Sequence, residues 1–133
     1  MIQVYEPLRC KELSFTLVES VAITLSKYVY ERFDLDVEDK KAMIGYIYED
    51  LLVIFTYLRD IGYSYANKSI GNFAYRGDYL ILMNPAALRD EPELNPPNKI
   101  ARMITREVIL IFDYDRHKHA DMLMDHLDEM SGM

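Results

Sequence analysis

The chain has 133 residues, half of them hydrophobic and 28% charged, and its 22 acidic and 15 basic residues leave a net charge of −7. This length and balance are typical of one globular domain, so we expect residues 1–133 to form a single domain rather than a disordered chain. The negative charge excludes non-specific nucleic-acid binding, because phosphate contacts need clustered basic residues, and a single cysteine excludes a disulfide framework.

The charged residues are spread too evenly for a membrane span. The longest run without Asp, Glu, Lys or Arg is Tyr79–Leu88, ten residues, whereas a spanning helix needs about 20. Charges near the start of the chain, among them Glu6 and Arg9, leave no room for the apolar region of a secretion signal. The lone Cys10 fits a reducing compartment, so the sequence predicts a cytoplasmic protein without a membrane partner.

Apolar residues in the first half of the chain follow helical spacing. After a β-prone stretch at residues 2–6, steps of three and four predict a long helix at about 11–33. Residues 33–36 read as a turn, and Asp36 is expected to cap a second helix over 36–61. Gly62 stands where a helix-terminating glycine is preferred. Two long helices with a short connection predict an antiparallel helical hairpin.

The next segment changes to a β-type pattern. The stretches 69–75 and 79–83 are both β-prone and are separated by Arg76-Gly77-Asp78, which predicts a β-hairpin. Asn84 and Pro85 predict the start of a short helical turn that runs through Leu88. The proline-containing stretch 90–97 predicts a surface connection.

The C-terminal third predicts one or two helices. Apolar spacing indicates a helix at 97–112, although the run 108–112 fits a buried strand equally well, and a further helix at about 116–130. The complete pattern predicts a helix-rich α+β fold: a long helical hairpin, a small β-hairpin and one or two C-terminal helices. The alternative is an all-α bundle in which residues 79–88 are helical.

Two clusters are candidate binding sites. Lys99, Arg102 and Arg106 are spaced by three and four, so they form one basic stripe that fits a small anion, a nucleotide or an acidic partner, or ion pairs within the chain. The three histidines all lie within residues 117–126 among several aspartates.

In that cluster Asp115, His119 and His126 share one helical face and are candidate ligands of a divalent metal, a solvated polar face being the alternative. No other cofactor is indicated by the sequence.

Tyrosine is the compositional outlier, with 11 residues and no tryptophan in the chain, and most tyrosines lie between residues 28 and 79. Tyrosine joins an apolar ring to a polar tip and is enriched at interfaces. Because no catalytic template is matched, we expect a non-enzymatic protein-interaction or regulatory domain, self-associating as a homodimer or bound to a protein partner. A metal-dependent enzyme or sensor and a small-anion or nucleotide binder are the alternatives.

Overall fold

The computed structural model describes residues 22–32, 34–66, 68–112 and 119–132. In chain order these form β1 (Ile23–Thr24), α2 (Leu25–Tyr30), α3 (Val37–Asp60), β2 (Ser64–Tyr65), β3 (Phe73–Arg76), β4 (Tyr79–Leu82), β5 (Leu88–Arg89), α4 (Pro97–Phe112) and α5 (Ala120–Ser131). Single 3-10 turns precede β3 and β5. The predicted helix-rich α+β fold is confirmed, and the all-α alternative is wrong because residues 79–82 form a strand.

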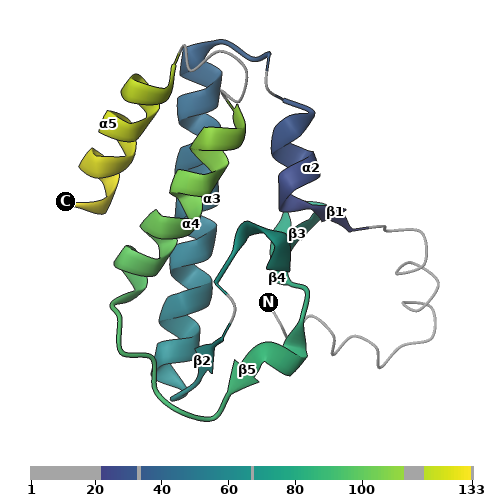
Figure 1. Cartoon of the computed structure of the whole chain (residues 1–133), viewed down its shortest axis with the longest axis vertical. Helices are drawn as coiled ribbons and strands as arrows, with labels where there is room; N and C mark the ends of the chain where they lie inside the picture. Colours follow the sequence, from purple (N-terminus) through teal and green to yellow (C-terminus); the bar gives the residue numbers. More distant parts are fainter. Residues whose placement is uncertain (1–21, 33, 67, 113–118, 133) are drawn as a thin grey trace.

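The long helix α3 is the centre of the molecule (Figure 1). It packs along α4, and α5 lies against both, while α2 and the strands lie on the other side. Its inner face is formed by apolar residues at helical spacing, among them Ile44, Ile47, Leu51 and Leu58, all of which are buried. Burying one such side chain contributes about 1.5–3 kcal/mol, so this face stabilises the helix far more than its intrinsic propensity does.

Both ends of α3 are set by local sequence. The carboxylate of Asp36 accepts a hydrogen bond from the backbone nitrogen of Asp39, as an N-cap should. At the other end Gly62 has a φ of 79°, its N–H bonds to the Arg59 carbonyl, and the N–H of Tyr63 bonds to the Leu58 carbonyl. These two bonds are the Schellman arrangement, so both predicted termini are confirmed.

The predicted first helix over 11–33 is confirmed at Leu25–Tyr30 and is wrong at Ile23 and Thr24. Residues 1–21, which include the predicted strand at 2–6, lie outside the described residues. Ile23 and Thr24 form a strand that pairs antiparallel with Tyr75 and Ala74 of β3, and the helix begins only at Leu25. Ile23 and Thr24 are β-branched and favour strands, and their pairing with β3 outweighs the helical spacing of the apolar residues.

The short helix α2 runs antiparallel to α3 (Figure 1), but it packs against α4 and β3. Its first turn is capped by the Thr24 hydroxyl, which accepts a hydrogen bond from the Lys27 nitrogen. Leu25 and Val29, one turn apart, are fully buried. A six-residue helix is unstable in isolation, so these two contacts hold it in place.

The β-hairpin is confirmed with a tighter turn than predicted. β3 and β4 pair antiparallel from Phe73 with Leu82 to Arg76 with Tyr79, which leaves a two-residue loop. The first loop residue, Gly77, has a φ of 64°, a conformation that a side chain disfavours. β1 adds on the other side of β3, and a separate pair joins β2 to β5.

The C-terminal region contains two helices. α4 extends through residues 108–112, so this ambiguous run is helical, with Val108 and Ile109 buried and Leu110 exposed. α5 begins at Ala120 and ends at Ser131, and its C-cap residue Gly132 has a φ of 74°. Within the described residues, no helix combines the length and the apolar character that crossing a membrane requires.

Candidate functional site

A cleft of about 330 Å³ lies where α2, α3 and the β-hairpin meet. We call it the tyrosine cleft. Among the described residues, its lining consists of three tyrosines, two aspartates and a glycine: Tyr28, Tyr46, Asp50, Tyr75, Gly77 and Asp78. A cleft that combines aromatic rings with carboxylates is suited to binding positively charged groups.

Each side of the cleft follows from its local structure. Tyr46 and Asp50 are four residues apart on α3, so both point to the same side of the helix. Tyr75 stands on β3, where it is buried, and the tight turn places Gly77 and Asp78 at the cleft's edge. Tyr28 is supplied by α2. The cleft therefore requires three elements to dock in one arrangement.

A hydrogen bond connects two walls of the cleft. The Tyr75 hydroxyl donates to Oδ2 of Asp50 with 2.8 Å between the oxygens. Burial raises the pKa of Asp50, the Tyr75 hydrogen bond acts in the opposite direction, and the nearby charge of Glu49 adds to the increase. Burial also raises the pKa of Tyr75, and Asp50 reinforces this shift, so the phenol stays protonated and remains a donor.

The aromatic cluster already holds one cation. The rings of Tyr28 and Tyr75 lie with centroids 4.6 Å apart at 39°. The guanidinium carbon of Arg32 lies 3.8 Å from the Tyr28 ring centroid, and its Nη1 donates to the Tyr28 carbonyl at 2.9 Å. This is cation–π geometry, and it shows that a positive charge fits against these rings.

The two carboxylates of the cleft, unlike the Tyr28 ring, have no cation paired with them among the described residues. Among the described residues, no lysine or arginine forms an ion pair with Asp50 or Asp78. Asp50 is half-buried, so water compensates its charge only in part. The cleft therefore presents a partly desolvated negative charge beside aromatic rings.

An exposed apolar row leads away from the cleft along α3. Tyr46, Val53 and Tyr57 follow steps of seven and four, and their exposed fractions are 66%, 63% and 48%. We call these three residues the α3 stripe. Glu49 and Asp50 lie beside the N-terminal end of this stripe, near Tyr46. Single exposed apolar residues are ordinary, whereas an aligned row of three large ones marks a candidate contact surface.

Two further hollows adjoin other parts of α2 and α3. One, of about 370 Å³, is lined by Glu38, Lys41, Ala42, Gly45, Tyr46, Glu49 and His126, so Tyr46 stands between it and the tyrosine cleft. The other, of about 440 Å³, lies between α2 and the end of α4 and is mainly apolar, with Thr24, Ser26, Lys27, Tyr30 and Ile111 in its lining.

The predicted metal ligands are not brought together in the described residues. Asp115 lies outside them. His119 immediately precedes α5, and its Nδ1 is 3.4 Å from the Nζ of the buried Lys40, where an ammonium group would compete with a metal ion. His126 lies two turns further along α5 and lines the hollow beside α3. No group of three His, Cys, Asp or Glu side chains within the described ranges is arranged to hold a metal ion.

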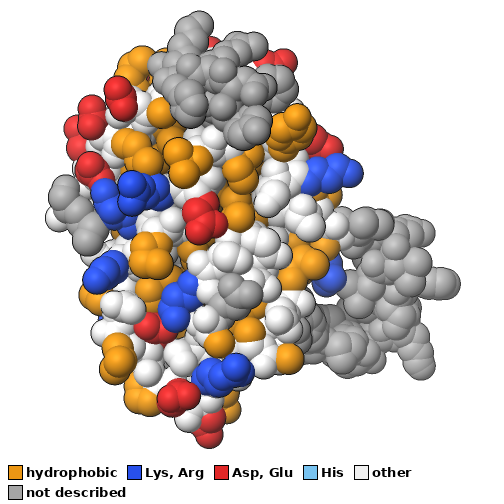
Figure 2. Space-filling view, viewed as in Figure 1, with side chains coloured by type: hydrophobic (Ala, Val, Ile, Leu, Met, Phe, Trp, Pro, Cys, Tyr) orange, Lys and Arg blue, Asp and Glu red, His pale blue; other side chains and the backbone are white. Residues whose placement is uncertain are grey.

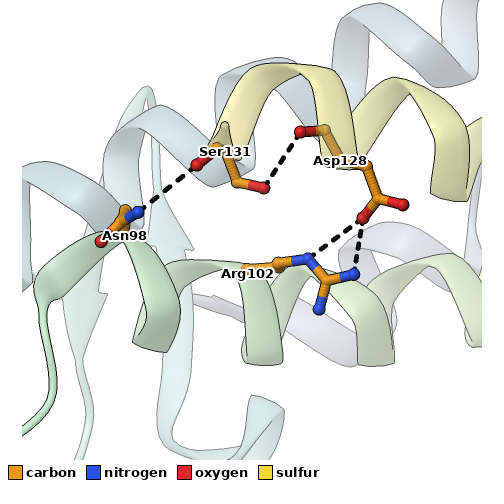
Figure 3. A network of polar contacts seen from close by, with 4 residues as sticks. All are labelled: Asn98, Arg102, Asp128 and Ser131. Atoms are coloured by element: carbon orange, nitrogen blue, oxygen red, sulfur yellow. Dashed lines mark hydrogen bonds and ion pairs between the residues drawn. The ribbon is translucent and has the colours of Figure 1, made fainter. Parts of the chain in front are cut away.

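The three residues of the predicted basic stripe differ in their contacts. Both Nε and Nη2 of Arg102 donate to Oδ1 of Asp128 on α5, the first at 3.1 Å (Figure 3). Lys99 and Arg106 are exposed. Basic side chains on this side of the molecule are scattered among apolar and acidic ones and do not gather into one patch (Figure 2). The central cation of the stripe thus joins two helices of the same chain.

The contact between α4 and α5 continues beyond this ion pair. The Asn98 side chain donates to the Ser131 carbonyl at 3.3 Å, and the Ser131 hydroxyl donates to the Asp128 carbonyl at 3.4 Å (Figure 3). These bonds satisfy carbonyls in the last turn of α5, and Arg102 compensates an acidic group at the negative end of that helix. The cluster shown in Figure 3 stabilises the fold.

Sequence reasoning marked the tyrosines but missed the tyrosine cleft. Tyr28, Tyr46 and Tyr75 belong to the tyrosine-rich stretch, yet Asp50 and Asp78 were not singled out. The one local signal was the four-residue spacing of Tyr46 and Asp50, which is common on helices. No protein-family model matches the chain, and neither a curated protein nor a solved structure matches it.

Proposed function

We propose that this chain is a non-enzymatic protein-interaction domain that binds a protein partner through the tyrosine cleft and the α3 stripe. The observation that carries the proposal is the continuity of the two surfaces at Tyr46, which lines the cleft and begins the stripe. Interfaces are enriched in tyrosine, and their best-packed contacts combine a pocket with an adjoining apolar surface.

The charge around this surface indicates the kind of partner. The chain carries a net charge of −7, and Glu49 and Asp50 border the stripe. Electrostatic complementarity steers association and suppresses like-charged partners, so a positively charged partner surface is favoured. Two copies meeting stripe to stripe would bring their own carboxylates together. Self-association remains a prediction from the sequence, which light scattering on concentrated protein tests.

Site-specific crosslinking tests the interaction. The photoreactive residue p-benzoylphenylalanine replaces Tyr57 in one variant and Leu94, an exposed loop residue outside both surfaces, in a control. In extract from the native source, position 57 is expected to give a discrete protein adduct that excess unlabelled wild-type chain competes away. The Val53→Asp variant is expected to compete poorly, because it places a charge in the stripe.

Two results would contradict the proposal. One is the same adduct pattern from positions 57 and 94, which would indicate non-specific contact. The other is equal competition by wild type and Val53→Asp. Circular dichroism of Val53→Asp provides the folding control, and since Val53 is exposed we expect an unchanged spectrum.

A further inference from the structure

We infer that the tyrosine cleft receives the cationic side chain of a lysine or arginine from the partner protein. This inference rests on the proposed function and names the chemistry of its central contact. The cleft combines two carboxylates, an exposed tyrosine ring and a volume of about 330 Å³, in which one long side chain fits.

The first argument is the state of Asp50. Its Oδ2 accepts the Tyr75 hydroxyl, and no ion pair to its carboxylate is formed by any described residue. A charge that is half removed from water interacts more strongly with an incoming cation than a fully solvated one does. Asp78, at the hairpin turn, adds a second carboxylate to the lining of the cleft. A single ammonium or guanidinium group carries enough donors for both.

The second argument is the arrangement of the aromatic rings. The guanidinium carbon of Arg32 lies 3.8 Å from the Tyr28 ring centroid, and the Tyr75 centroid lies 4.6 Å from it. The Tyr28 ring therefore already contacts one cation and one aromatic ring. Tyr46 lines the cleft and is 66% exposed, so its ring is accessible to a cation that enters the cleft. Tyr46 would bind the partner's cation through the same kind of cation–π contact that Tyr28 makes with Arg32.

The third argument is the direction of the α3 stripe. Tyr57 lies eleven positions after Tyr46 on α3, which corresponds to about 16 Å along a helix. A partner segment lying along α3 therefore places apolar side chains on Val53 and Tyr57 while one basic side chain enters the cleft. A basic amphipathic segment satisfies both requirements, and the carboxylates of Glu49 and Asp50 favour basic side chains along the edge of its apolar face.

Small probes test the cleft without the partner. N-acetyl-lysinamide and N-acetyl-argininamide are titrated into the full chain, with N-acetyl-norleucinamide as the neutral control, and amide shifts are followed by NMR. We expect saturable shifts at Asp50 and Gly77 with a cationic probe, with a dissociation constant in the millimolar range, and none with the neutral one. Saturation by either cation supports the inference, and the stronger one identifies the preferred head group.

Variants identify the groups responsible. Asp50→Asn keeps an acceptor for Tyr75 but removes the charge, and we expect about tenfold weaker probe binding. The matched control Asp90→Asn, at an exposed loop position, should leave binding unchanged. Tyr46→Phe keeps the ring and should bind within about twofold of wild type, whereas Tyr46→Leu should bind about threefold more weakly.

The outcomes separate this inference from the proposed function. Shifts from the neutral probe equal to those from both cations, or cation binding unchanged in Asp50→Asn, would overturn the inference. Val53→Asp should retain probe binding, because Val53 does not line the cleft that the probe enters. If crosslinking at position 57 is competed as expected while neither cation binds, the inference falls and the proposed function stands.

Discussion

Tyr75 on β3 is hydrogen-bonded through its hydroxyl to Oδ2 of Asp50 on α3, with 2.8 Å between the two oxygens. The residues are 25 positions apart, and the bond ties the hairpin to the central helix at the tyrosine cleft. The same contact orients the carboxylate that we infer to bind the partner's cation. Loss of the hydroxyl therefore affects both the fold and the site.

Tyr75→Phe is expected to lower the free energy of unfolding by about 1–3 kcal/mol, because a hydrogen bond to a charged acceptor is lost. The hydrogen bond lowers the pKa of Asp50, so its removal should raise that pKa further. Urea denaturation measures the first effect and a carboxyl NMR titration the second. Tyr79→Phe in the same hairpin is the control, because Tyr79 is largely exposed. Equal effects of the two substitutions would show that the bond contributes nothing.

The ion pair between Lys68 and Glu93, with 2.9 Å between Nζ and Oε1, joins the loop after β2 to the proline-containing connection before α4. Burial alone would raise the pKa of Glu93, but hydrogen bonds from Lys68 and Asn95 and the charge of Lys68 outweigh it, so this pKa is lowered. A carboxyl whose pKa is lower in the folded chain binds protons more weakly there than in the unfolded chain. It stabilises the fold at neutral pH, and this contribution is lost as the pH falls through the lowered pKa.

Glu93→Gln is therefore expected to destabilise the chain at pH 7 by about 1–3 kcal/mol and to differ less from wild type as the pH falls. Thermal unfolding across a pH series measures the difference. Glu91→Gln, at an exposed neighbouring position, should follow wild type at every pH. A destabilisation by Glu93→Gln that grows toward acid pH would contradict the lowered pKa of Glu93.

The contact of Arg102 with Asp128 is partly exposed, so its contribution is expected to be small. A double-mutant cycle with Arg102→Gln and Asp128→Asn should give a coupling free energy of about 0.5–1 kcal/mol that decreases with added salt. Arg106→Gln, at an exposed position on the same helix, should change stability by less than about 0.5 kcal/mol. A coupling energy of zero at low salt would show that this ion pair does not help to hold α5 against α4.

Two glycines of the α3 region should respond in opposite directions to the same substitution. Gly45 lies inside the helix, and an added Cβ would make ordinary contact with the Met130 sulfur at 3.6 Å, so Gly45→Ala should stabilise by about 0.5–1 kcal/mol. Gly62 has a φ of 79°, so Gly62→Ala should destabilise by about 1–2 kcal/mol although nothing lies near the added atom. Chemical denaturation of both variants checks this pair, and equal signs would contradict it.

The elements that were predicted well are those whose signals are local. Asp36 and Gly62 limit α3 through hydrogen bonds to residues of the same helix, so the sequence around them is sufficient. The β3–β4 hairpin is likewise specified by its two-residue turn. The beginning of α2 was not predicted, because Ile23 and Thr24 adopt a strand through pairing with a segment about 50 residues away.

The candidate sites also differ in this way: local spacing predicted which side chains share a helix face, and only the structure showed their partners. Helical spacing placed Arg102 on a stripe, but the packing of α5 supplied Asp128 as its partner. Asp115 lies outside the described residues, and the proposed pairing of His119 with His126 on a metal is not seen among the described side chains. Residue spacing on one helix states which side chains share a face, and it does not state what approaches that face.

The sequence by itself determined the charge of −7, the predominance of helix, both ends of α3 and the abundance of tyrosine, because composition, periodicity and capping depend on single residues or near neighbours. Only the tertiary structure decided that Tyr28, Tyr46 and Tyr75 meet around Asp50. The three rings come from α2, α3 and β3, and they converge because burial of apolar faces docks those elements together. Such docking depends on contacts between distant segments, and no local pattern records it.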